Sequence, residues 1–165
     1  MAVLSDKDIV LRVQNGTLGI KPFNQSNLTP NGYDLTIKEI FIPPNSRHEN
    51  GLVRIHAGNW MAISTLEYVK MSLDLVGFLW TRTSYGRKGL FGSYGAVDAG
   101  FQGELTLSYY ATHDVEVQIG SRIAQLVFCE LSSPSDQGYA ARSGNFQGQV
   151  GITLTSKDKN LTPGA

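Results

Sequence analysis

The stretch G95-A-V-D-A-G-F-Q-G-E-L-T-L-S-Y-Y110 joins a glycine-rich turn to a run of alternating residues. Its second half, G103-E-L-T-L-S-Y-Y110, alternates apolar and polar side chains, which is typical of a half-buried strand. Two carboxylates, Asp98 and Glu104, stand among glycines and apolar residues in this stretch. We expect Asp98 to be partly desolvated and Glu104 to be a surface or cross-strand charge.

Similar short runs occupy most of the chain on both sides of this stretch. They are separated by Gly, Pro, Asn and Ser, which are typical of turns. This arrangement predicts a mainly β fold, which could be a sandwich, a jelly roll or a distorted barrel. The expected strands are residues 33–37, 51–55, 60–65, 75–80, 103–110, 115–119, 122–128 and 150–154.

One short helix is expected near the N-terminus, at about residues 5–16. Ser5 can cap this helix, acidic residues occupy its first turn, and the pair N15-G16 ends it. The chain of 165 residues is long enough for one domain with a real core and too short for two ordinary ones. We therefore expect a single domain over residues 1–165, with a C-terminal arm at about residues 135–165.

The composition narrows the class of protein. With 14 basic and 14 acidic residues, no overall field directs the chain to nucleic acid or to an anionic membrane. No segment approaches the roughly 18 apolar residues of a membrane span, and residues 1–10 turn acidic where a signal peptide is apolar. A cytoplasmic protein is expected. The single cysteine, Cys129, excludes an internal disulfide and lies in an apolar run, where it is expected to be buried.

The densest basic cluster is T81-R-T-S-Y-G-R-K-G-L90, which follows an apolar strand. The guanidinium groups of Arg82 and Arg87, together with hydroxyls and glycine amides, are the groups that bind polyphosphates. The hydroxyls belong to Thr83 and Ser84. The spacing of a Walker loop is absent, and the alternative interpretation is a solvated basic turn.

Three other features are candidates for chemistry. Asp98 could hold a water and act as a general base, or it could be a turn aspartate bonded to its own backbone. Gln125 interrupts an otherwise apolar strand and points either to solvent or into a polar site. The segment Y139-A-A-R-S-G-N-F-Q-G-Q149 could be an ordinary loop, or an arm that folds over a ligand and brings Arg142 and Gln147 to it.

Taken in order, five segments resemble the motifs of the deoxyuridine triphosphatase and deoxycytidine triphosphate deaminase superfamily. The resemblance covers roughly residues 28–155, and its last motif is similar to the short one of the deaminase-like and archaeal branch. It implies a distorted β-barrel or jelly-roll protomer, a homotrimer with active sites at subunit interfaces, and Mg²⁺ bound through the triphosphate of the nucleotide. The five segments are N31-G-Y-D-L-T36, R82-T-S-Y-G-R-K-G-L90, V97-D-A-G-F-Q-G-E-L105, G120-S-R-I-A-Q-L-V-F128 and R142-S-G-N-F-Q-G148.

The resemblance also implies roles for single residues. Asp98 matches the aspartate that orients and deprotonates the water attacking the α-phosphate, while Arg82 and Gln125 would stabilise charge on the phosphates. Phe101 matches the aromatic that packs under the deoxyribose and leaves no room for a 2′-hydroxyl. Asp34 would be structural or would organise water and metal, with no protein ligand binding Mg²⁺ directly. The residues implied to contact the substrate are Thr83, Ser84, Arg87, Val97, Phe101, Tyr139, Arg142 and Gln147.

Ser108 separates the two activities of the superfamily. Its deaminases carry a glutamate about ten residues after the aspartate, which shuttles the proton when water attacks C4 of cytosine. A serine cannot replace that carboxylate as a base without a partner, and Glu104 lies roughly 13 Å away along the strand. The sequence therefore predicts hydrolysis of dUTP to dUMP and pyrophosphate. The alternatives are a dCTP deaminase, a bifunctional enzyme and a non-catalytic deoxynucleotide-binding trimer.

Overall fold

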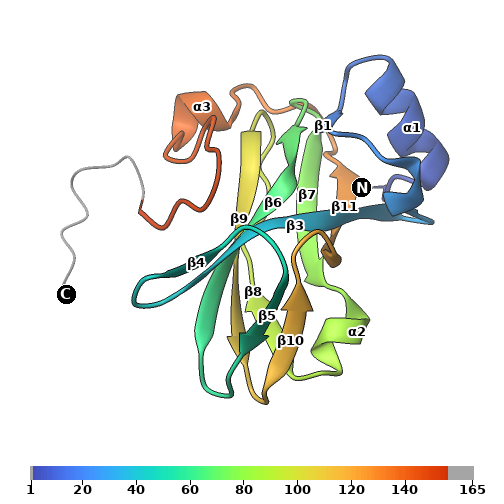
Figure 1. Ribbon diagram of the computed structural model, residues 1–165. Helices are drawn as coiled ribbons and strands as arrows, with labels where there is room; N and C mark the ends of the chain where they lie inside the picture. Colours follow the sequence, from blue (N-terminus) through green and yellow to red (C-terminus); the bar gives the residue numbers. More distant parts are fainter. Residues whose placement is uncertain (1, 156–165) are drawn as a thin grey trace.

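The computed structural model describes residues 2–155, which form a strongly curved, barrel-like sheet (Figure 1). The main sheet has nine strands, with β7-β11-β3-β6-β9-β8 along its path and β1, β2 and β4 attached at its sides. Strands β5 and β10 form a separate pair. The strands are β1 (Gly19–Lys21), β2 (Leu28–Thr29), β3 (Gly32–Ile42), β4 (Ser46–His48), β5 (Leu52–Ile55), β6 (Trp60–Lys70), β7 (Leu75–Thr81), β8 (Leu90–Ser93), β9 (Gln102–Ala111), β10 (Val115–Gln118) and β11 (Arg122–Glu130).

The predicted mainly β class is confirmed. The sheet is antiparallel throughout its named pairs, and the long strand β3 joins its two parts by pairing first with β11 and then with β6. Apolar side chains from these strands fill the interior, and each fully buried one stabilises the fold by about 1.5–3 kcal/mol. They include Leu35, Ile63, Leu107 and Phe128, and Cys129 is also buried, as predicted.

Helical segments occupy the ends of this sheet. They are α1 (Asp6–Gln14), the 3-10 helix η1 (Gln25–Asn27), α2 (Thr83–Gly86) and α3 (Tyr139–Arg142). Helix α1 begins with the expected cap, since the Ser5 hydroxyl accepts a hydrogen bond from the Asp8 amide at 3.3 Å and the Asp8 carboxylate accepts one from the Ser5 amide at 3.1 Å. Among the described residues, no helix is long and apolar enough to cross a membrane.

Seven of the eight expected strands are present, generally within longer ones. The exception is the segment 150–154, which forms no strand because its backbone amides bond to side chains of β3 and β9 rather than to a neighbouring strand. Four strands were not predicted: β1, β2, β4 and β8. Each has only two to four residues, too few to show a periodic pattern.

Candidate active site

Asp98 begins a four-residue turn between β8 and β9. The Phe101 amide donates a hydrogen bond to the Asp98 carbonyl oxygen at 3.1 Å, and Gly100 has the left-handed φ of +79° that the third residue of a type II turn requires. Val97, just before the turn, pairs with Gly77 of β7 through two backbone hydrogen bonds of 2.8 and 2.9 Å. The sheet therefore fixes the base of this turn.

The Asp98 side chain itself is exposed. The prediction that it is partly desolvated is wrong for the single chain, because the described residues leave this side chain open to solvent although they partly cover Ala99 and Gly100 of the same turn. Within residues 2–155, its carboxylate forms no ion pair and no hydrogen bond, so the alternative of an aspartate bonded to its own turn is not observed. The carboxylate is available to a water or a ligand.

A cavity of about 310 Å³ lies beside Asp98. Its wall combines apolar and aromatic side chains with several polar groups, and both kinds of group occur in small-molecule sites. Tyr139 of α3 packs edge-on against Phe101, with the ring centroids 5.5 Å apart. Among the described residues that line the cavity, Asp98 is the only carboxylate; Val97, Leu105, Phe146 and Gln149 also belong to the wall.

The C-terminal segment packs on the same turn. The Gln147 side-chain amide donates to the Gly100 carbonyl at 3.1 Å, and its oxygen accepts a hydrogen bond from the Gln102 amide at 3.2 Å. Arg142 lines a neighbouring cavity of about 300 Å³ that also includes Asp98. The part of the predicted arm beyond residue 155 lies outside the described residues, and the part before it is folded onto the protein.

A second group of candidate residues lies where β3, β7 and β11 are side by side. Arg82 Nε is 3.0 Å from Asp34 Oδ2, and an Arg122 guanidinium nitrogen is 3.7 Å from the same oxygen. Burial raises the pKa of Asp34, and the charges of Arg82 and Arg122 act in the opposite direction. Gln125 Nε2 donates to Thr29 Oγ1 at 2.5 Å. The two ion pairs favour the structural role among the alternatives for Asp34.

The two groups do not meet within one chain. Gln125 is paired with Trp80 of β7, whereas Val97 is paired with Gly77, three residues or roughly 10 Å further along the same strand. The cavity lined by Asp98 and the cleft lined by Arg82 share no residue. The remaining predicted phosphate ligands are exposed on or beside α2; they are Thr83, Ser84 and Arg87.

Sequence reasoning missed several residues of the two groups. Ser93 and Tyr94 line the Asp98 cavity, and the Tyr94 hydroxyl is hydrogen-bonded to the Thr81 hydroxyl at 2.9 Å. They reach the cavity through the pairing of the short strand β8 with β9, which leaves no periodic signal. Arg122, by contrast, is visible in the sequence as a charge that interrupts an otherwise apolar strand, although this pattern assigns it no role. Its guanidinium also donates to the Ser26 carbonyl oxygen at 2.9 Å.

A barrel-like β fold, with Asp98 as the only carboxylate among the described residues that line its cavity, agrees with the class of nucleotide enzyme that the sequence motifs suggest. A family model described as dCTP deaminase-like matches residues 43–131, which is more than half of the chain. The protein therefore belongs to the family of dCTP deaminases and dUTPases, and it is an enzyme of that family.

The names of the relatives include both activities. The chain is 36% identical over 145 residues to a dCTP deaminase of Pyrococcus horikoshii, covering 85% of this chain and 91% of that one. It is 32% identical over 160 residues to a probable deoxyuridine 5′-triphosphate nucleotidohydrolase of Sulfolobus islandicus rod-shaped virus 1, covering 94% and 99%. These names leave the reaction open between dUTP hydrolysis and dCTP deamination.

A solved structure supports the fold independently. The dCTP deaminase of Agrobacterium tumefaciens superimposes with a TM-score of 0.67 at 17% identity, over 76% of this chain. The matched region is 47% of that deaminase, so this protein spans about half of its length. At this level of identity the comparison concerns the fold and not the reaction.

Proposed function

We propose that the protein hydrolyses dUTP to dUMP and pyrophosphate. The observation that carries the proposal is the carboxylate of Asp98 in the wall of the 310 Å³ cavity, which is exposed and has no ion pair or hydrogen bond within residues 2–155. A general base must reach the proton that it takes, and this carboxylate can contact a bound water. Asp98 would accept a proton from the water as the new O–P bond forms at the α-phosphate and pyrophosphate leaves.

The cavity fits a deoxynucleoside better than a whole nucleotide triphosphate. Its volume lies at the lower end of the range of about 300–1,000 Å³ for small-molecule sites, so the phosphates would extend outside it. Phe101 and Tyr139 would pack against the sugar and base. The backbone of residues 97–109, which includes Val97, would read the edge of the pyrimidine.

The phosphates would be bound by the second group of residues, supplied by a neighbouring subunit of a homotrimer. Two observations support this assembly: the single chain keeps Arg82 apart from Asp98, and large apolar side chains are exposed along one cleft between β7 and β8, the two end strands of the sheet path. Such exposed apolar residues are typical of subunit contacts. Light scattering should give three times the chain mass of 18.0 kDa. The exposed residues are Phe78 and Trp80 on β7 and Phe91 on β8, and the proposed phosphate ligands are Arg82, Thr83, Ser84, Arg87 and Gln125.

Magnesium fits this site as a partner of the triphosphate. Within residues 2–155 there is no cluster of three His, Cys, Asp or Glu side chains that could hold a metal ion. Asp34 is occupied by two guanidinium groups, whereas Asp98 is free to contact a metal-bound water. Mg²⁺ bound to the nucleotide would neutralise part of the phosphate charge.

Deamination of dCTP is the second candidate, because the Pyrococcus relative bears that name. Ser108, at the position of the deaminase glutamate, donates its hydroxyl to the Ser93 carbonyl oxygen at 3.3 Å. Glu104 cannot take over the proton transfer, because its oxygens already bind Lys38 and the Gly151 amide. These contacts favour hydrolysis.

One assay tests the proposal: incubation with dUTP or dCTP and Mg²⁺, with pyrophosphate and ammonia measured separately. Pyrophosphate from dUTP without ammonia from dCTP is the expected result. Ammonia from dCTP would identify a deaminase or a bifunctional enzyme. Nucleotide binding without either product would identify a non-catalytic nucleotide-binding protein and overturn the proposal.

A further inference from the structure

Two carboxylates that the proposed reaction does not use are buried beside the C-terminal segment. Glu39 of β3 is 5% exposed and Glu104 of β9 is 7% exposed. Lys38 Nζ lies 2.7 and 2.9 Å from the two Glu104 oxygens, and an Arg47 guanidinium nitrogen lies 2.6 Å from Glu39 Oε2. A buried charge is costly unless it is paired, and these cations supply the pairing.

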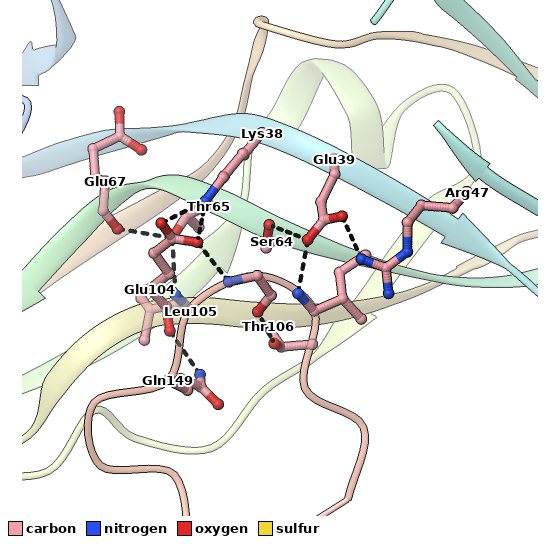
Figure 2. Close-up of polar contacts among 12 residues, drawn as sticks. Lys38, Glu39, Arg47, Ser64, Thr65, Glu67, Glu104, Leu105, Thr106 and Gln149 are labelled. Carbon is pink, nitrogen blue, oxygen red and sulfur yellow. Dashed lines mark hydrogen bonds and ion pairs between the residues drawn. The ribbon is translucent and has the colours of Figure 1, made fainter. Parts of the chain in front are cut away.

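Each carboxylate also binds a backbone amide of the C-terminal segment (Figure 2). The Gly151 amide donates to Glu104 Oε2 at 2.7 Å, and the next amide, that of Ile152, donates to Glu39 Oε1 at 2.8 Å. Hydrogen bonds to an ionised acceptor are roughly twice as strong as neutral ones. Two successive amides are thus held by acids from two different strands.

Neighbouring contacts extend this attachment over residues 149–153, which we call the strap. The Gln149 side-chain amide donates to the Glu104 carbonyl at 2.6 Å, and the Glu104 amide donates to the Gln149 carbonyl at 3.0 Å. At the other end, the Thr153 amide donates to the Thr106 hydroxyl at 3.0 Å. The strap therefore follows β9 on the side where Figure 2 shows the two acids.

The middle of the strap requires glycine. Gly151 has a φ of +71°, in the left-handed region that side-chain-bearing residues rarely adopt, and a Cβ at this position would lie 2.9 Å from Glu39 Oε1. The backbone conformation therefore favours glycine, and an added Cβ would also force the Glu39 carboxylate to shift.

The strap forms part of the wall of the Asp98 cavity. Gln149 and Thr153 line that cavity, as does Phe146 just before the strap, whereas Glu39 and Glu104 do not. We propose that Glu39 and Glu104 are positioning residues that hold the strap against the cavity and so set its affinity for the nucleotide. The identity of the nucleotide rests on the proposed function.

The test compares Glu39→Gln, Glu104→Gln and the double variant with Glu116→Gln, the same change at an exposed glutamate of β10. Hydrogen exchange of the strap amides is measured without nucleotide. Binding of α,β-imido-dUTP is measured by calorimetry, and kcat and KM are measured with dUTP. The double variant should exchange at least about tenfold faster at 151–153 and bind the analogue about tenfold more weakly, with kcat within about threefold.

The outcomes separate the two proposals. Faster exchange with unchanged analogue binding would show a purely structural strap and overturn the positioning role, as would unchanged exchange and unchanged binding. If the wild-type protein binds the analogue but does not hydrolyse dUTP, the proposed hydrolysis fails. Weaker binding of the analogue by the glutamine variants would then still support the positioning role. A wild-type protein that does not bind the analogue would overturn both.

A second variant acts from the strap and leaves both carboxylates in place. Gly151→Ala should give the same faster exchange and weaker binding as the double glutamine variant. Gly51→Ala is its matched control, because Gly51 also has a positive φ, of +82°, but an added Cβ would meet no atom within 4 Å among the described residues other than its chain neighbours. Equal nucleotide affinity for these two alanine variants would overturn the proposal even where the glutamine variants fail to fold.

Discussion

Asp98 and Glu104 are six residues apart in one stretch, yet their surroundings are opposite. Asp98 is exposed and, within the described part of the chain, has no ion pair. Glu104 is 7% exposed and its oxygens are bound by Lys38 and the Gly151 amide. The difference arises because the first acid lies on a turn and the second lies inside a strand that other segments cover. A free carboxylate can do chemistry, whereas a paired, buried one maintains structure.

The strongest test of this contrast is Asp98→Asn. The amide cannot accept the proton of the attacking water, so kcat for dUTP hydrolysis should fall by about 10³-fold. Binding of α,β-imido-dUTP should persist, and the free energy of unfolding in urea should change by less than about 0.5 kcal/mol, because the side chain is exposed and forms no hydrogen bond or ion pair within residues 2–155. Substantial remaining hydrolysis would refute the role of Asp98 as the base.

Removal of the other acid should have the reverse effect. Glu104→Ala should lower the free energy of unfolding by about 2 kcal/mol, because it leaves a cation and an amide without their partner. The value is less than for a fully buried pair, since the Lys38 side chain is 37% exposed and water can solvate part of its charge. Urea denaturation measures the change, with Glu116→Ala as the exposed control. Equal urea midpoints for Glu104→Ala and Glu116→Ala would contradict the structural role of Glu104.

The sequence pattern predicted the strand that carries Glu104, but it did not predict that Asp98 and Glu104 have opposite surroundings. Alternation located strand 103–110. Val97, Phe101 and Tyr139, which the resemblance implied as substrate contacts, line the same cavity as Asp98, and their contact with a substrate stays a prediction. The burial of Glu104 could not be predicted, because its partners are 66 and 47 residues away along the chain. The expectation of a surface charge is therefore wrong, whereas the expectation of a cross-strand charge is correct.

The C-terminal segment shows the same limit. The alternation of residues 150–154 imitates a strand, but the amides of Gly151 and Ile152 bond to carboxylates, a choice that depends on how β3 and β9 lie together. The separation of Arg82 from Asp98 was likewise not visible, because it follows from where each strand pairs. Motifs identify chemical groups, while strand pairing decides which of them meet.

A third acid in the same stretch would sharpen the comparison. Ser108→Glu restores a carboxylate at the position that deaminases of the superfamily use, and it removes one hydrogen bond to the Ser93 carbonyl. We expect slow ammonia release from dCTP, roughly 100-fold or more below an aligned site, because a misplacement of about 1 Å has that cost. Ammonia from the wild-type protein would instead show that another base had replaced the glutamate.

Asp74 is intermediate between Asp98 and Glu104, because it is paired but partly exposed. Its replacement should lower the stability by less than the replacement of Glu104. Its carboxylate accepts a hydrogen bond from the Ser72 hydroxyl at 2.5 Å and lies 2.9 Å from Arg12 of α1, yet its side chain is 34% exposed. The Ser72 hydroxyl and, after it, Arg12 lower the pKa of Asp74. Because solvent screens a pair of this exposure, Asp74→Asn should lower the free energy of unfolding by only about 0.5 kcal/mol at pH 7.

The pH dependence of that small loss identifies its origin. A carboxyl whose pKa is lowered on folding stabilises the protein above its unfolded pKa of about 3.9, and this contribution disappears as the pH falls through the folded pKa. The difference in urea midpoint between the wild type and Asp74→Asn should therefore shrink between pH 5 and pH 3. A difference that stays constant over this range would mean that the pair contributes through packing, and that ionisation does not distinguish Asp74 from an uncharged residue.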